Sequence, residues 1–187
     1  MVGLGNPGPR FSGTRHNVGF AVLEEAAARL GVSFRKPLFA RYRISPTPRR
    51  APPSLVLAQP LTYMNRSGEV LPGLLSRAGS TPEQMLVICD NLDLEPGRLR
   101  MKSGGGTAGH RGLASIVDIL GHGNFLRLYV GVGRPTGTSV VDHVLGVPPE
   151  NERELYEQAI ARAADAVLRL ADTDTDRLMT EVNRRNG

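Results

Sequence analysis

The chain has 187 residues, 40% of them hydrophobic, so it can bury one sizeable core but is short for two full domains. Its one cysteine excludes an internal disulfide and a cysteine-built zinc site, and 23 basic against 18 acidic residues give a net charge of +5, which favours contact with a polyanion. We therefore expect a single domain over residues 1–187. We also expect a reducing cytoplasm as its location, since no stretch has the pattern of a signal peptide or a membrane span.

The chain begins with a short apolar stretch and a turn. Met1–Leu4 is typical of the end of a strand, and Gly5–Gly8 has the glycine and proline content of a turn. Apolar residues then recur at helical spacing from Asn17 to Leu30, and Gly31 follows as a C-terminal cap. We expect a short strand followed by a helix.

The next segment predicts a hairpin and a second helix. Alternating residues favour a strand over Phe39–Ile44, and the proline-rich segment Ser45–Ser54 leads into an apolar strand at Leu55–Ala58. Ser67 is well placed to cap a helix over Glu69–Arg77.

Two further strands differ in pattern. Met85–Cys89 is continuously apolar, as expected for a strand buried on both faces, and Asp90 stands at its end. Arg98, Arg100 and Lys102 alternate with apolar residues, so a strand here would project three cations from one face.

The last third alternates helix and strand. The glycine-dense loop Ser103–Gly112 precedes a predicted helix at Leu113–Leu120, and Leu126–Val132 alternates as a strand. Pro149–Asn186 has a helical apolar stripe that is broken near Asp172–Asp176. The order of elements predicts an α/β protein, a three-layer α/β/α sandwich with a twisted, mixed but largely parallel sheet and an antiparallel hairpin.

Four polar residues follow the predicted strands or lead into the first helix, namely Asn6, His16, Asn65 and Asp90. Each alone has an ordinary explanation as a turn former, a cap or a locally bonded helix residue. Sites in open α/β sheets form outside the carboxyl ends of the strands, where loops gather groups from distant parts of the chain. Their joint placement therefore indicates a site at one edge of the sheet.

Six ordered sequence blocks resemble the signature blocks of bacterial peptidyl-tRNA hydrolases, and VVDHVLG at Val140–Gly146 adds weaker support. The blocks are VGLGNPG at Val2–Gly8, TRHNVGF at Thr14–Phe20, PLTYMNRSG at Pro60–Gly68, DNLDLEPGRLRMKSGGG at Asp90–Gly106, GHRGLASI at Gly109–Ile116 and RLYVGVGRP at Arg127–Pro135. The resemblance spans most of the chain and implies hydrolysis of the ester bond between peptide and tRNA.

By that resemblance His16 is the general base, Asp90 orients it, and Asn6 and Asn65 hold the substrate. The residue types suit ester hydrolysis, because a neutral imidazole can deprotonate the attacking water at neutral pH. A carboxylate on the far ring nitrogen fixes the tautomer and stabilises the imidazolium. An amide donor, with Asn65 the first candidate and backbone N–H groups of the glycine-rich loop the alternative, can stabilise the tetrahedral oxyanion.

The resemblance also implies contacts with the peptide and the tRNA acceptor end. Phe11, Tyr63 and Met64 would line the channel, where an aromatic face can stack on a base, although Met64 is equally well explained as a core residue. Lys102 matches the family's phosphate-binding lysine, and Arg98 and Arg100 lie beside it in sequence. The remaining substrate contacts implied are His110 and Arg111.

Three positions depart from the family's pattern. Tyrosine is usual at Phe11 and asparagine is frequent at Arg111, so a hydroxyl contact is lost and the use of the arginine is open. Some members carry a second phosphate-binding arginine at the position of Tyr129, which leaves Arg127 and Arg134 as candidate replacements.

Other functions fit less well. GLGNPG matches the dinucleotide-binding pattern G-x-G-x-x-G, but prolines interrupt the place where its helix should open. No serine-hydrolase elbow is present, and the histidines show no metal-binding spacing, so we expect neither cofactor nor metal. The stronger alternative is a noncatalytic RNA-binding relative of the same fold. We expect a monomer without membrane contact.

Overall fold

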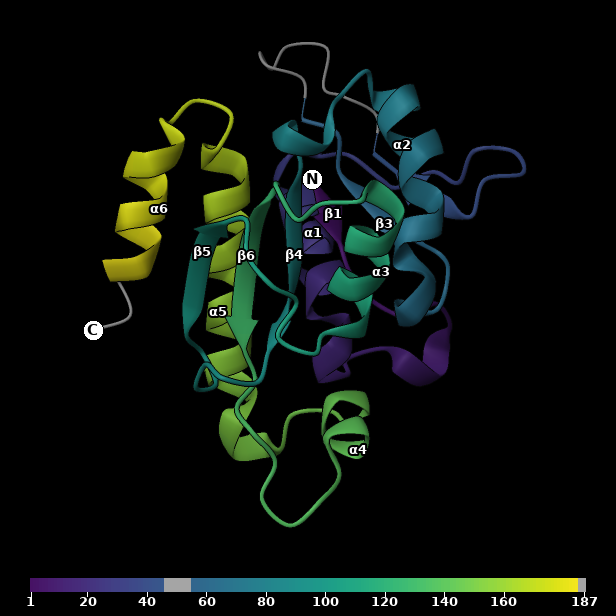
Figure 1. Ribbon diagram of the computed structural model, residues 1–187. Coiled ribbons are helices and arrows are strands. Elements are labelled where there is room, and N and C mark those ends of the chain that lie inside the picture. The colour runs from purple at the N-terminus through teal and green to yellow at the C-terminus, as the bar shows by residue number, and fades with distance from the viewer. Residues whose placement is uncertain (46–54, 185–187) are drawn as a thin grey trace.

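The computed structural model describes residues 1–45 and 55–184, so most of the predicted proline-rich connection lies outside the described residues. The described chain forms one six-stranded sheet in the order β2-β3-β1-β4-β6-β5 (Figure 1). Its strands are β1 (Val2–Gly3), β2 (Tyr42–Ile44), β3 (Ala58–Pro60), β4 (Leu86–Asn91), β5 (Leu99–Ser103) and β6 (Leu126–Gly131).

The centre of the sheet is parallel and both edges are antiparallel. Strands β3, β1, β4 and β6 pair in parallel, whereas β2 pairs with β3 and β5 pairs with β6 in the antiparallel sense. The predicted mixed sheet with an antiparallel hairpin is therefore confirmed. The carboxyl ends of the parallel strands meet at one end of the sheet, where loops can form a site.

Helices cover both faces of the sheet, as the predicted three-layer sandwich requires (Figure 1). Helices α1 (Val18–Arg29), α5 (Glu150–Arg169) and α6 (Thr175–Arg184) pack on one face around a core that includes Leu23, Ile88 and Leu128. The 3₁₀ helix η3 (Met64–Val70), α2 (Leu71–Ala78) and α3 (Arg111–Leu120) pack on the other. The remaining helices are η1 (Pro9–Phe11), η2 (Arg15–Asn17), η4 (Pro82–Gln84) and α4 (Val140–Leu145). None of the helices in the described part of the chain combines the length and hydropathy that a membrane span requires.

Two glycines let α1 lie directly on the central strands. A Cβ at Gly3 would stand 2.2 Å from the carbonyl oxygen of Gly19, and a Cβ at Gly19 would stand 2.4 Å from the backbone of Leu4 and Ile88. The close approach brings η2, immediately before α1, over the end of β4. It thereby sets His16 beside Asp90 in space.

Most predicted elements are present, and their ends follow the expected signals. Helix α1 stops before Gly31, whose φ is 65°, and α3 stops before Gly121 at 76°, both in the left-handed region that glycine tolerates. In β5 the apolar residues are buried while Arg100 and Lys102 are exposed, as the alternation predicted. The long C-terminal helix divides into α5 and α6 near Asp172.

Three local predictions were wrong and one helix was missed. The strand predicted at Leu55–Ala58 is β3 at Ala58–Pro60, so the two share only Ala58. The strand predicted from Phe39 begins only at Tyr42, and Phe39 is 94% exposed with φ at 59°, outside any strand. Ser67 caps no helix: it lies inside η3, where its hydroxyl donates to the Met64 carbonyl. Helix α4 was not predicted as an element, because its six residues offer less than two turns of periodicity.

Candidate active site

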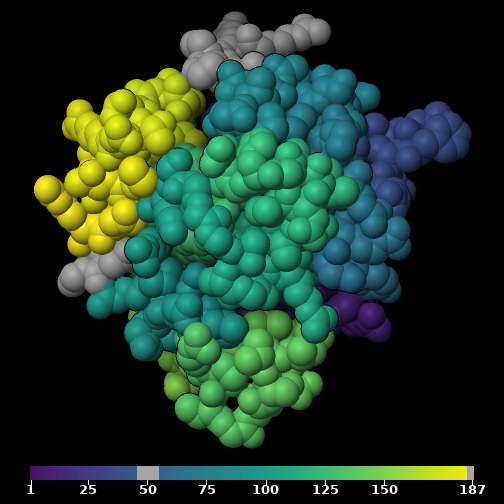
Figure 2. All heavy atoms as spheres, viewed as in Figure 1, coloured from purple at the N-terminus to yellow at the C-terminus, as the bar shows by residue number. Residues whose placement is uncertain are grey.

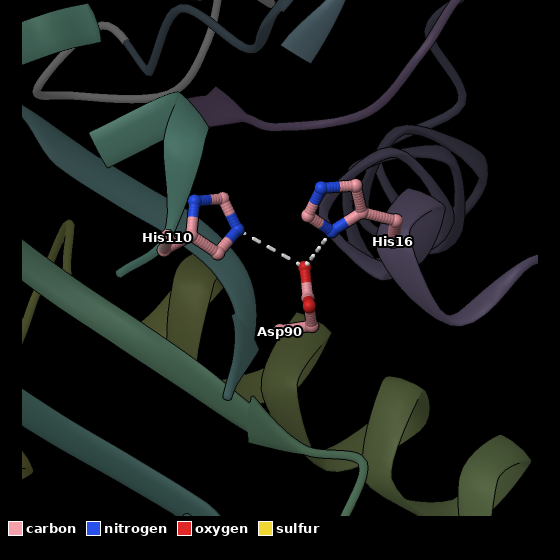
Figure 3. A group of neighbouring side chains, drawn as sticks. All are labelled: His16, Asp90 and His110. Carbon is pink, nitrogen blue, oxygen red and sulfur yellow. Dashed lines mark hydrogen bonds and ion pairs between the residues drawn. The ribbon is translucent and has the colours of Figure 1, made fainter. Parts of the chain in front are cut away.

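One buried carboxylate joins two histidines at the end of β4. Asp90 is 3% exposed, and its Oδ1 lies 2.8 Å from Nδ1 of His16 and 3.1 Å from Nε2 of His110. Figure 3 shows the two rings on either side of this one oxygen. The residues come from η2, from β4 and from the turn before α3, so the contact that sequence reasoning expected between His16 and Asp90 is present, with a second histidine added.

The hydrogen bonds fix how the protons are arranged on both rings. Nδ1 of His110 accepts from the backbone N–H groups of Gly112 and Leu113, so the ring proton lies on Nε2 and is donated to Asp90. His16 donates from Nδ1 to the same carboxylate. In neutral His16 the lone pair is therefore on Nε2, which makes no hydrogen bond with any residue in the described ranges.

The Asp90 carboxyl stays ionised in this setting. Burial alone would raise the pKa of Asp90, but its electrostatic interactions with His110 and His16, each of which donates a hydrogen bond to it, outweigh burial. The pKa of Asp90 is consequently held well below its ordinary value. An ionised Asp90 can orient both imidazoles and stabilise a positive charge on His16.

The segment that carries His16 is fastened from the far end of the chain. Arg15 is buried, and its guanidinium donates to the Val147 carbonyl at 3.0 Å and pairs with Glu152 at 3.1 Å. The Tyr156 hydroxyl donates to the Arg15 carbonyl at 3.2 Å. These contacts tie η2 to the start of α5.

A pair of asparagines sets the first loop. The Asn17 side chain accepts from the Asn6 N–H at 2.8 Å and donates to the Asn6 carbonyl at 3.0 Å. The side-chain oxygen of Asn6 in turn accepts from the Met64 N–H at 2.8 Å. Asn6 was expected to offer both a donor and an acceptor, but the acceptor is thus occupied by the protein. Only its amide N–H₂ remains for a ligand.

The polar groups open into a cavity of about 360 Å³. Nearly every predicted site residue lines it: Asn6, Phe11, His16, Tyr63, Met64, Asn65, Asp90, His110 and Arg111. Helix α4 supplies a further, apolar wall through Val140, Val141, Val144 and Leu145, three of which are exposed. Sequence reasoning missed this wall. In the space-filling view the segment around α4 forms a lobe below α3 (Figure 2).

The aromatic side of the cavity is built around Phe11. Its ring meets Tyr63 edge to face at 6.5 Å, and the Arg10 guanidinium lies 4.4 Å above it. Tyr63 is 54% exposed, whereas Met64 is buried in the core cluster beneath α3 while also lining the cavity. Met64 is therefore both a core residue and a cavity-lining residue, the two interpretations that the sequence left open. Asn65 is exposed at the cavity.

The predicted cations lie in three places: at the cavity, on the exposed face of β5 and in the interior. Arg111 lies on the cavity rim as the first residue of α3, and Arg134 lines the cavity while paired with Asp93. Lys102 is exposed on β5 and does not line the cavity. Arg127 is fully buried, so the suggestion that it contacts a phosphate directly is wrong.

The His16, Asp90 and His110 donor atoms lie within 4.8 Å of one another, a grouping that could hold a metal ion and that their spacing in sequence did not reveal. Hydrogen bonds between the same atoms already account for the arrangement. A metal ion would have to displace the protons from both nitrogens that face Asp90.

Comparisons with known proteins identify the family of this chain. The family model described as "Peptidyl-tRNA hydrolase" matches residues 1–187. A peptidyl-tRNA hydrolase of Dehalococcoides mccartyi is 44% identical, covering 100% of this chain and 98% of that protein, and one of Geobacillus thermodenitrificans is 40% identical, covering 98% of each. A crystal structure of the Acinetobacter baumannii enzyme matches with a TM-score of 0.89 at 37% identity, over 97% of this chain and 92% of that one. The chain belongs to the peptidyl-tRNA hydrolase family.

Proposed function

We propose that this protein hydrolyses the ester bond between a peptide, or an N-blocked amino acid, and tRNA, and so returns tRNA to translation. The observation that carries the proposal is the geometry at His16. Its Nδ1 is bound to the buried Asp90 at 2.8 Å, and its Nε2 faces a cavity lined by amide donors. Family membership supplies the substrate class.

In the proposed mechanism Nε2 of His16 accepts a proton from water as the water oxygen attacks the ester carbonyl. The carbonyl π electrons move to its oxygen and give a tetrahedral oxyanion. When the intermediate collapses, the C–O bond to the ribose breaks and His16 returns the proton to the leaving 3′ or 2′ oxygen. Asp90 remains ionised throughout and stabilises the imidazolium by its hydrogen bond.

Amide donors stabilise the oxyanion and hold the peptide in this proposal. The exposed Asn65 side chain is the candidate oxyanion donor, a contact worth roughly 3–4 kcal/mol in transition-state stabilisation. Asn6, whose oxygen is bound to the Met64 N–H, offers its amide N–H₂ to a peptide carbonyl. A carbonyl, unlike a free ammonium group, accepts such a donor, so this contact favours peptidyl-tRNA over ordinary aminoacyl-tRNA.

The remaining predicted residues take roles in binding the substrate. Phe11 and Tyr63 offer ring surfaces to the terminal base, and Arg111 offers a charged donor at the rim. Both ring nitrogens of His110 are hydrogen-bonded, Nε2 to Asp90 and Nδ1 to the backbone at the start of α3. His110 therefore positions Asp90 and can contact the substrate only through its ring carbon atoms. Lys102, outside the cavity, contacts a phosphate of the acceptor arm.

We further propose that residues 1–187 form one domain that acts as a monomer in the cytoplasm. A translation-related substrate supports this location. All the residues to which the proposed chemistry assigns a role lie in one chain around one cavity, so this chemistry needs no second copy.

Release of an N-blocked amino acid from charged tRNA tests the proposal. We expect rapid release from N-acetylated aminoacyl-tRNA and little from the same tRNA carrying the unblocked amino acid. Binding of both without release would favour the noncatalytic RNA-binding alternative. Equal release from both would contradict the role given to Asn6.

A further inference from the structure

A cation is buried within the sheet without an acidic partner. Arg127, on β6, is fully buried and forms no ion pair with a residue in the described ranges. Its Nε has no hydrogen-bond partner there, and its guanidinium lies 4.7 Å from the Phe125 ring. Burial of a charge is costly unless other contacts compensate, so the partners that Arg127 does have indicate what it is for.

Two of those partners are backbone carbonyls of the glycine-rich loop between β5 and α3. One guanidinium nitrogen donates to the Gly106 carbonyl and to the Tyr129 hydroxyl, and the other donates to the carbonyls of Gly105 and Gly123. The planar fork of an arginine can serve several acceptors at once from one fixed position. Arg127 therefore holds the inner side of the loop.

The outer side of the same loop is in contact with Lys102. Cross-strand pairing sets Lys102 directly opposite Arg127, so both side chains project from the same face of the sheet. A Cβ at Gly105, where φ is 102°, would stand 2.5 Å from Nζ of Lys102. The loop is thus enclosed between a buried cation and an exposed one.

We infer that Arg127 is a positioning residue for tRNA binding, which holds the Gly105–Gly106 loop so that Lys102 is presented to a backbone phosphate. The inference rests on the proposed function, since it names how that function's polyanionic substrate is held. Arg127 is too deeply buried to touch a phosphate and acts only through the loop. The positive charge of Arg127 lies beneath the Gly105–Gly106 loop, opposite Lys102, and strengthens the attraction of this surface for an anion.

A double-mutant cycle with Lys102 tests the inference. The variants are Arg127→Lys, Lys102→Ala and the pair, and the measurement is the dissociation constant of uncharged tRNA over a series of salt concentrations. Lysine at 127 keeps the charge but cannot serve all the carbonyls. We expect each single variant to weaken binding and to lower the salt slope by about one unit, as expected for one lost phosphate contact.

The pair should bind little worse than either single variant, because both remove the same contact. Losses that multiply would overturn the inference, as would unchanged binding by Arg127→Lys. Arg77→Met, at an exposed arginine on α2, is the control for loss of one positive charge. Absence of tRNA binding by the unmodified protein would instead count against the proposed function.

Gly105→Ala provides a second route that leaves Arg127 in place. Alanine is strained at a φ of 102°, so the substitution would distort the loop, and its Cβ would displace the ammonium end of Lys102. Binding of tRNA should therefore weaken when Lys102 is present and change little further in Lys102→Ala. Release of an N-blocked amino acid from a phosphate-free adenosine ester reports whether each variant has an assembled catalytic site. Unchanged tRNA binding by a folded Gly105→Ala protein would show that loop position does not matter and would overturn the inference.

Discussion

His16 has one ring nitrogen bound to Asp90 and the other directed to a cavity, and this difference between its two nitrogens defines its proposed role. His16→Ala should slow release of N-blocked amino acid by at least about 10²–10⁴-fold, the usual contribution of a general base. The affinity for tRNA should change little, because the cations supply it. Single-turnover hydrolysis and equilibrium tRNA binding measure the two effects separately.

His122→Ala is the matched control, since this histidine lies outside the cavity and pairs with Glu83 on the surface. It should hydrolyse the substrate at the rate of the unmodified protein. Full activity in His16→Ala would refute the assignment of the base.

The strand ends predicted that His16 and Asp90 would lie at one edge of the sheet, and the resemblance to peptidyl-tRNA hydrolases implied that the two side chains would meet. The same reasoning did not find the bond from His110 to Asp90, nor the pair of hydrogen bonds that join Asn17 to Asn6. Both depend on the exact path of a turn, which has no sequence periodicity. Asn17, directly after His16, is the available signal, but in the sequence it indicates only the start of a helix.

At the level of elements, η3 and α3 touch backbone to backbone at one glycine. A Cβ at Gly68 would stand 2.1 Å from the Ser115 carbonyl oxygen, and the Gly68 N–H donates to the Ser115 hydroxyl at 3.0 Å. Gly68→Ala should lower the free energy of unfolding by about 1–3 kcal/mol or more, because the helices must separate. Urea unfolding followed by circular dichroism measures this change.

Gly73→Ala is the control within the adjoining helix α2. No atom lies within 4 Å of a Cβ at Gly73, so the free energy of unfolding should rise by about 0.5–1 kcal/mol from the better helix propensity of alanine. Equal effects of the two substitutions would contradict the close contact between η3 and α3.

Long or strongly patterned elements could be predicted closely from the sequence, whereas several short ones were misplaced or missed. The buried strand β4 and the helices α1, α3 and α5 lie close to their expected bounds, since apolar spacing over many residues specifies them. Helix α4 is too short for such a pattern. Its Ser139 cap and the bonds of His143 to the carbonyls of Val132 and Gly133 are visible only in the fold.

For the molecule as a whole, the lowered pKa of Asp90 makes the free energy of unfolding depend on pH in acid. Its pKa is lower in the folded than in the unfolded chain, so the unfolded chain takes up the proton first as the pH falls. The stabilisation is fully present above the ordinary carboxyl pKa of about 3.9 and is lost as the pH falls below it. The free energy of unfolding should therefore fall more steeply below pH ~4 in the unmodified protein than in Asp90→Asn.

Urea unfolding at a series of acidic pH values measures these slopes, with the exposed Asp118→Asn as the control. Parallel curves for the unmodified protein and Asp90→Asn would show that Asp90 contributes nothing to the acid transition.

The attachment of Arg15 to Glu152, Val147 and Tyr156 makes the position of His16, the proposed base, depend on residues more than 130 positions later in the chain. Damage to the beginning of α5, by proteolysis or by a destabilising substitution, would free the turn that carries the imidazole while the sheet and Asp90 stayed in place. Such a protein would keep its fold and its affinity for RNA and lose turnover first.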